Sequence, residues 1–187
     1  MPVFRVEYPI LILLLSAVLL GCSQPPSQKD TLSPQTNTTQ TEFDQIVESL
    51  DTPQKLRDFM KKYFSIEERG GCTAYEPQKF FELRKGDCKD YSAFSSLVLS
   101  RHGYNAQMLC FDLYSSEGVR TTGHVVTVFK VNGELKYMSL HHIEPASSVQ
   151  DVLESERDRL GYSRIGDYET VPAGSTYICP QYNPTGR

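Results

Sequence analysis

The chain has 187 residues, which is enough for one domain of ordinary size with its own core and too few for two. Hydrophobic residues make up 39% and charged residues 22%, values that are typical of a globular chain and exclude a multi-span membrane protein or a fully disordered one. The net charge is -4, and the Lys and Arg residues are scattered. No dense positive stripe is available to neutralise phosphates, so we expect no nucleic-acid partner.

The first 21 residues are typical of a secretory leader. An apolar run of 12 residues, Pro9 to Leu20, follows Arg5 and precedes Gly21-Cys22. This run is too short to span a bilayer. The segment Leu19 to Cys22 resembles a bacterial lipobox, in which cleavage leaves Cys22 as the lipidated first residue. The alternative is an ordinary signal peptide that leaves Cys22 as a linker thiol.

Residues 22–41 are predicted to form the lipidated cysteine and a disordered tether. From Ser23 to Thr41 there is no aromatic residue and one aliphatic residue, Leu32, so burial cannot offset the entropy of ordering. Residues 42–187 are then expected to form a single domain that the lipid anchors at the cell envelope. Ser23 follows the cysteine instead of Asp, which in a Gram-negative cell indicates the outer membrane, facing the periplasm.

Helices are predicted in three places before residue 104. Thr52 caps the first of them, in which apolar residues recur every three or four positions as far as Phe64. A short helix follows over Gln78 to Arg84. Asp87 caps the third, which ends at Gly103 and places Cys88 in its first turn.

The next part of the chain is typical of strands. These are predicted over residues 105–113, 125–131 and 134–140, and Asn132-Gly133 joins the last two as a tight hairpin. A further helix is predicted over 148–160. The tyrosine-rich tail after it has no clear period, and its structure stays open.

The hairpin turn also predicts which side chains lie together. Counting outward from a two-residue turn places Val126 opposite Ser139 and His124 opposite His141. Side chains two positions apart share a face of a strand, so His124, Ser139 and His141 are expected on the same side.

These positions permit nucleophilic chemistry. A helix N-terminus favours the thiolate form of a cysteine, and Cys88 lies at such a place. A histidine on a neighbouring strand then accepts or shares the proton, and a third group fixes its tautomer. His124 and Ser139 fit these two roles.

Two segments carry a family resemblance. Residues Lys85 to Phe94 (KGDCKDYSAF) and Gly123 to Val126 (GHVV) resemble the nucleophile segment and the histidine strand of the bacterial transglutaminase-like superfamily. The resemblance covers about Thr52 to Leu140. It implies an α+β fold with a papain-like core, in which the nucleophile helix packs against an antiparallel sheet. Cys88 would be the nucleophile and His124 the general base.

The third position departs from the family pattern. The usual residue is Asp, fifteen places after the histidine, and this chain has Ser139 there. Serine accepts a hydrogen bond from the imidazole ring but provides no charge to stabilise an imidazolium. Asp112 on the preceding strand and His141 are the other candidates for orienting His124.

The sequence therefore predicts a membrane-anchored, monomeric cysteine acyl-transfer enzyme acting on a protein or peptide substrate. Hydrolysis of a peptide or carboxamide bond is expected first and transamidation second, with no cofactor and no metal. The alternative from another class is a catalytically inactive binding module at the cell envelope, which Ser139 favours. A third interpretation is a redox role for the thiols.

Three further cysteines bear on that last interpretation. They are Cys72, Cys110 and Cys179, an odd number, so that two can pair while one stays a thiol. Cys110 lies among apolar residues in a predicted strand and is assigned to the core. This makes Cys72 with Cys179 the pairing that we favour.

Overall fold

A computed structural model describes residues 38–176 of the chain, and all of them belong to one compact unit. Three predicted features lie outside the described residues. They are the leader, the lipid site Cys22, and Cys179 as the partner of Cys72. Between residues 38 and 176, no helix is both long enough and apolar enough to cross a membrane.

Five helices and seven strands make up the described part of the chain. In chain order they are α1 (Thr38–Ser49), α2 (Pro53–Tyr63), β1 (Ser65–Ile66), α3 (Pro77–Leu83), β2 (Lys85–Gly86), α4 (Cys88–Arg101), β3 (Gln107–Tyr114), β4 (Arg120–Val131), β5 (Glu134–Ser139), β6 (His142–Pro145), α5 (Val149–Leu160) and β7 (Arg164–Pro172).

The predicted helices are present, and their ends are set by the expected capping residues. The Thr52 hydroxyl accepts a hydrogen bond from the backbone N–H of Lys55 at the start of α2. At the start of α4, the Asp87 side chain accepts a hydrogen bond from the backbone N–H of Asp90, and the Asp90 side chain accepts one from the backbone N–H of Asp87. These two reciprocal bonds form a complete capping box. Gly161 ends α5 with φ of 75°, in the left-handed region that glycine adopts without strain.

Helix α1 is an element that the sequence analysis did not predict. It begins at Thr38, inside the segment expected to be a tether, and extends past residue 42. Its Phe43 and Val47, four residues apart, are buried in the core together with Leu50, which directly follows the helix. The ordered structure therefore starts earlier than expected, because this short apolar stripe finds a surface to cover.

The main sheet is antiparallel with the strand order β6-β5-β4-β3-β7. The predicted turn at Asn132-Gly133 is confirmed, since Val131 pairs with Glu134 and the ladder between β4 and β5 continues to Thr127 opposite Met138. Strands β6 and β7 lie in segments for which no strand was predicted. Strand β4 begins at Arg120, earlier than expected, because β3 pairs with it over its first half.

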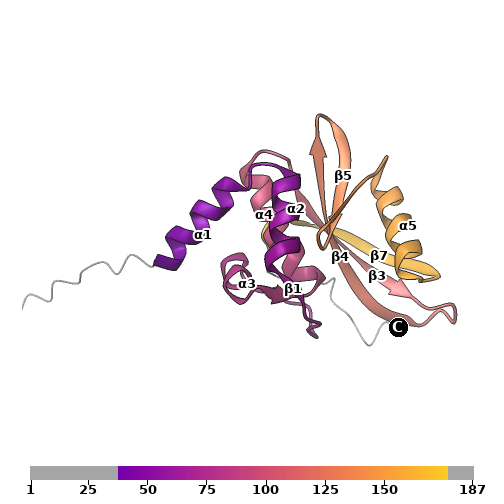
Figure 1. The fold of residues 1–187 in the computed structure, drawn as a ribbon. Coiled ribbons are helices and arrows are strands. Elements are labelled where there is room, and N and C mark those ends of the chain that lie inside the picture. The colour runs from indigo at the N-terminus through magenta and orange to yellow at the C-terminus, as the bar shows by residue number, and fades with distance from the viewer. Residues whose placement is uncertain (1–37, 177–187) are drawn as a thin grey trace, which may run out of the picture. The chain divides into compact units, whose positions relative to one another are not determined.

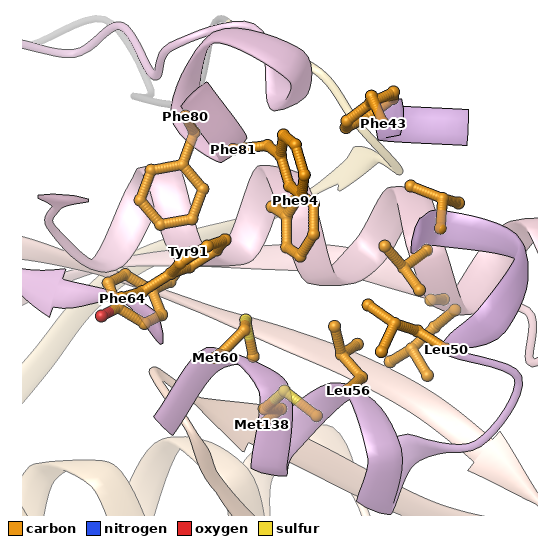
Figure 2. Close-up of a cluster of buried hydrophobic side chains, with 14 of the residues drawn as sticks. Phe43, Leu50, Leu56, Met60, Phe64, Phe80, Phe81, Tyr91, Phe94 and Met138 are labelled. Atoms are coloured by element: carbon orange, nitrogen blue, oxygen red, sulfur yellow. The ribbon is translucent and has the colours of Figure 1, made fainter. Parts of the chain in front are cut away.

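The sheet lies between two helical layers (Figure 1). Helices α1 to α4 cover one face, and α5 covers the other with Val152 and Leu153. Helix α4 is nearly enclosed, and its Phe94 lies in a cluster of aromatic rings with Phe64 and Phe80 (Figure 2). This confirms the predicted α+β class with the nucleophile helix packed on an antiparallel sheet, and it holds the start of α4 in place.

Candidate active site

The sequence places Cys88 at the first residue of α4, directly after the capping residue Asp87. Its thiol is free and partly buried, and it lines a cleft of about 840 Å³. Within the described chain, the backbone N–H of Cys88 has no hydrogen-bond partner, while the next three N–H groups bond to Asp87. One helix-end donor is therefore available beside the sulfur.

Charged groups around this helix start are neutralised in pairs. The Asp90 carboxylate is fully buried and accepts hydrogen bonds of 2.7 and 2.9 Å from the Arg69 guanidinium. Lys89 bonds to Asp87 and to the Arg69 carbonyl oxygen. Each of the two carboxylates next to Cys88 is paired with a cation. Asp87 and Asp90 therefore add no net negative charge that would repel a thiolate at Cys88.

Hydroxyl groups fix α4 against β4. Ser92 donates to the backbone oxygen of Val125 at 3.1 Å, and the hydroxyls of Ser95 and Thr127 are 2.6 Å apart. These buried contacts set the position of Cys88 relative to the residue before Val125, which is His124.

His124 lies on β4 with its side chain 12% exposed, and its ring packs edge-on against Phe111 at 5.6 Å between centroids. The ring lines the same cleft as the Cys88 thiol, which is one of the groups that raise its pKa. Its Nε2 is 3.1 Å from the Glu156 carboxylate. The structure thus brings together two predicted residues, Cys88 and His124, with a carboxylate that the sequence analysis did not name.

Ser139, the residue predicted for the third position, also lies beside the ring. Its Oγ is 3.3 Å from His124 Nε2, and it donates to Glu156 Oε2 at 2.9 Å. Arg159 donates to the Ser139 hydroxyl at 2.9 Å and to both oxygens of Glu156. Ser139 therefore bridges His124 and Glu156, while the charge that the family's usual Asp would supply comes from α5.

The two other candidates for orienting His124 are not in contact with it. Asp112 lies opposite Gly123 and forms an ion pair of 2.8 Å with Arg120. His141 lies in the turn after β5 and packs on His142 at 4.5 Å between ring centroids. The expected pairing of His141 with His124 is wrong, because the β4–β5 ladder ends at Thr127 and the chain turns at Leu140, where φ is 54°.

Glu156 was missed because it is separated from His124 by 32 residues and stands in a helix rich in charge. One signal was present in the sequence. Glu156 follows Val152 and Leu153 by four and three residues, and these two form the buried stripe of α5. A carboxylate on the apolar stripe of a helix is costly unless it is paired, so it indicates a partner in the core.

The charges of His124 and Glu156 stabilise each other. Burial disfavours the His124 imidazolium, but hydrogen bonds and charges from Cys88 and Glu156 outweigh it and raise the pKa of His124 to about 9. Burial likewise disfavours the Glu156 carboxylate, but His124, Arg159 and Ser139 outweigh it and lower the pKa of Glu156 to about 2. The arrangement therefore favours the imidazolium form of His124 beside an ionised Glu156 at neutral pH.

The directions of these two pKa shifts determine how the contribution of His124 and Glu156 to stability depends on pH. The folded pKa of His124 is raised, so its contribution is complete below about pH 6.5 and is lost as pH rises through about 9. The folded pKa of Glu156 is depressed, so its contribution is present above about pH 4.5 and is lost as pH falls through about 2.

Two more cysteines line the same cleft, Cys72 and Cys110. Cys72 is a free thiol, and Cys110 is buried on β3, as expected for a core residue. The favoured disulfide between Cys72 and Cys179 stays a prediction, because Cys179 lies outside the described residues. Among residues 38–176, no three His, Cys, Asp or Glu side chains gather as they would around a metal ion.

Comparison with known proteins places this fold and site in a family. A family model described as the transglutaminase-like domain matches residues 35–157, which is more than half of the chain. The chain therefore belongs to the transglutaminase-like family, as the resemblance of its two motifs indicated. The matched range includes the cysteine, the histidine, Ser139 on β5 and Glu156 on α5.

No curated protein sequence matches this chain. Among solved structures, one match is the crystal structure of NAT3, an arylamine N-acetyltransferase from Bacillus cereus described as having a unique Cys-His-Glu catalytic triad. It shares 13% identity over 54% of this chain, with a TM-score of 0.31. The aligned part spans 40% of the acetyltransferase, so this chain covers less than half the length of that enzyme.

Proposed function

We propose that this protein is a cysteine acyl-transfer enzyme that hydrolyses, or secondarily transamidates, peptide or carboxamide bonds. The observation that carries the proposal is the arrangement of Cys88, His124 and Glu156, in which the thiol and the imidazole line one cleft and a buried carboxylate bonds to the imidazole. A nucleophile at a helix start, a base on the adjacent strand and a buried carboxylate behind it are the parts that nucleophilic acyl transfer needs.

In the first half of the reaction, the Cys88 sulfur attacks the carbonyl carbon and forms a C–S bond. The carbonyl oxygen becomes an oxyanion, and the unpartnered N–H of Cys88 donates to it. The C–N bond then breaks as the His124 imidazolium gives its proton to the departing amine. The products of this half are a thioester on Cys88 and a neutral His124.

In the second half, water or a second amine attacks the thioester carbon. His124 accepts the proton of the attacking group, the C–S bond breaks, and the thiolate and imidazolium are restored. Glu156 stabilises the imidazolium each time it forms. Water yields a carboxylic acid, and an amine yields a new amide. These steps use side chains of this chain alone.

The competing interpretation was an inactive binding module, and it rested on the absence of a carboxylate at position 139. Glu156 supplies a carboxylate at 3.1 Å from the ring, with Ser139 holding it in place. That argument for an inactive protein therefore no longer applies, and we retain the enzyme.

The test is the rate at which iodoacetamide alkylates Cys88 near pH 6.5, followed by mass mapping of the purified protein. We expect Cys88 to react faster than Cys72 in the same protein, because Cys88 lies at a helix N-terminus and shares its cleft with the His124 imidazole. The substitution His124→Ala is expected to slow Cys88 by about tenfold or more. His142→Ala is the matched control, since His142 is exposed and lies away from the thiol. Equal rates in the two variants would sink the proposal.

We also propose that Cys22 carries lipid and that the protein is held at the cell envelope, on the periplasmic face of the outer membrane in a Gram-negative cell. The support is the sequence of the leader and the lipobox-like segment Leu19 to Cys22. We expect labelled palmitate to be incorporated into the protein expressed with its leader and not into Cys22→Ser. A mature protein whose Cys22 is an unmodified thiol would contradict this.

A further inference from the structure

One wall of the cleft is a short extended segment that runs beside the start of α4. It begins with β1, which pairs in parallel with β2, and the backbone N–H of Glu67 then donates to the Gly86 oxygen at 2.8 Å. The next contact joins the N–H of Arg69 to the Asp87 carboxylate at 3.2 Å. The segment is therefore held along the chain as far as the residue directly before Cys88.

The side chains of this segment alternate between the cleft and the outer surface, as they do in an extended chain. Ile66 and Glu68 line the cleft that contains Cys88. Glu67, between them, instead forms an ion pair of 2.7 Å with Lys85. The wall beside the thiol thus presents one apolar and one acidic side chain to the cleft.

The acidic side chain of this wall is not neutralised. Glu68 is exposed, and its carboxylate forms no ion pair or hydrogen bond with another residue of the described chain. The other two acids that line the cleft each pair with a cation, Asp87 with Lys89 and Asp112 with Arg120. Glu68 therefore leaves a negative charge in the cleft with which a bound molecule can pair.

The apolar side chain provides contact area next to that charge. Ile66 is 55% exposed and lies two positions before Glu68, on the same side of the segment. Lysine and arginine lay their aliphatic stems along apolar surface while the charged head reaches a polar partner. The combination of Ile66 and Glu68 thus matches a long basic side chain better than a short or an acidic one.

We propose that Ile66 and Glu68 form a subsite for a lysine or arginine side chain of the substrate, within two residues of the bond that Cys88 attacks. This deepens the proposed function and rests on it, because it assigns the substrate class of the Cys88 site. Ile66 covers the aliphatic stem, and the Glu68 carboxylate pairs with the cation. The substrate is thus a peptide segment with a basic residue close to the reacting carbonyl.

The test uses acetylated dipeptide chloromethyl ketones in which lysine or norleucine takes each position in turn, with alanine at the other. Norleucine has the side-chain carbons of lysine without the ammonium group. In each reaction the Cys88 thiolate displaces chloride and forms a C–S bond, so the second-order rate reports how well the probe is held. At one of the two positions we expect lysine to react about threefold to fivefold faster than norleucine, the effect that an exposed ion pair provides.

Variants of the wall then assign the preference to its residues. Glu68→Gln should bring the ratio of lysine to norleucine rates to about one, and Glu68→Lys should invert it. Glu67→Gln is the matched control, because its carboxylate is one residue away and pairs with Lys85, and it should keep the ratio. Ile66→Ser should slow the lysine and norleucine probes alike, relative to the probe with two alanines.

The ratio does not depend on the reactivity of the thiol, because both probes meet the same Cys88. A natural chain that prefers lysine at neither position overturns the inference while leaving the reactive Cys88 intact. So does a Glu68→Gln variant that keeps the preference. Failure of iodoacetamide to alkylate Cys88 preferentially would instead remove the proposed function and this inference with it.

Discussion

Replacing Glu156 by glutamine is expected to lower the rate of acyl transfer by up to about four orders of magnitude, the loss seen when the carboxylate of a related triad is replaced by an amide. The substitution keeps the size of the side chain but removes the charge that stabilises the His124 imidazolium. Ser139 still reaches the ring at 3.3 Å, so part of its orientation survives. The measurement is the rate of amide hydrolysis, or of Cys88 alkylation if a substrate is not in hand.

The pH dependence separates this role from a structural one. His124 must hold a proton to give to the leaving amine, so activity is expected to fall as pH rises through about 9, the pKa of His124. Removing the Glu156 charge makes the imidazolium less stable and lowers this pKa. The basic limb of the pH–rate profile should therefore move to lower pH in Glu156→Gln.

The matched control is Glu154→Gln, two residues earlier on the same helix, where the carboxylate is exposed and bonds to Gln150. It should leave both the rate and the basic limb where they are. If Glu156→Gln lowers the rate without moving the basic limb, the carboxylate acts on the fold and not on His124.

Replacing Asp90 by alanine is expected to lower the free energy of unfolding by about 3–5 kcal/mol, the cost of breaking a buried ion pair. The Asp90 carboxylate is fully buried and accepts from the Arg69 guanidinium and from the backbone N–H groups of Tyr75 and Asp87. Its loss leaves these donors without a partner. Gly86 leaves room for it, since an added Cβ there would lie 2.5 Å from a carboxylate oxygen.

Urea denaturation followed by circular dichroism measures this loss. The matched control is Asp58→Ala, because Asp58 is exposed and, among residues 38–176, pairs only with the neighbouring Arg57. The control should change stability by no more than about 0.5 kcal/mol. A similar small change in Asp90→Ala would show that Asp90 contributes little beyond its helix cap.

The start of α4 could be predicted from the sequence because its determinants are local. Asp87 and Asp90 cap the first turn, and the capping box alone places Cys88 at the helix N-terminus. The β4–β5 hairpin could be predicted equally well, since Asn132-Gly133 adopts the positive φ values that a tight turn requires. Both features depend on residues within a few positions of each other.

Helix α1 and strands β6 and β7 could not be predicted in this way. Phe43 and Val47 form a buried stripe on α1 only because α3 and α4 provide a surface for them. Strand β7 has little apolar alternation of its own, and it exists because the outer edge of β3 was available for pairing. Such elements are stabilised by their partners more than by their own sequence.

The sequence by itself determined the place of Cys88, the place of His124 and the family, because these rest on a helix cap, a hairpin turn and two short motifs. Only the tertiary structure decided the third member of the site. Glu156 reaches His124 because Val152 and Leu153 pack α5 onto the sheet in a register that no local pattern encodes. The β4–β5 ladder likewise ends at Thr127, where the chain turns after Ser139 at Leu140, and no short motif in the sequence indicated this ending.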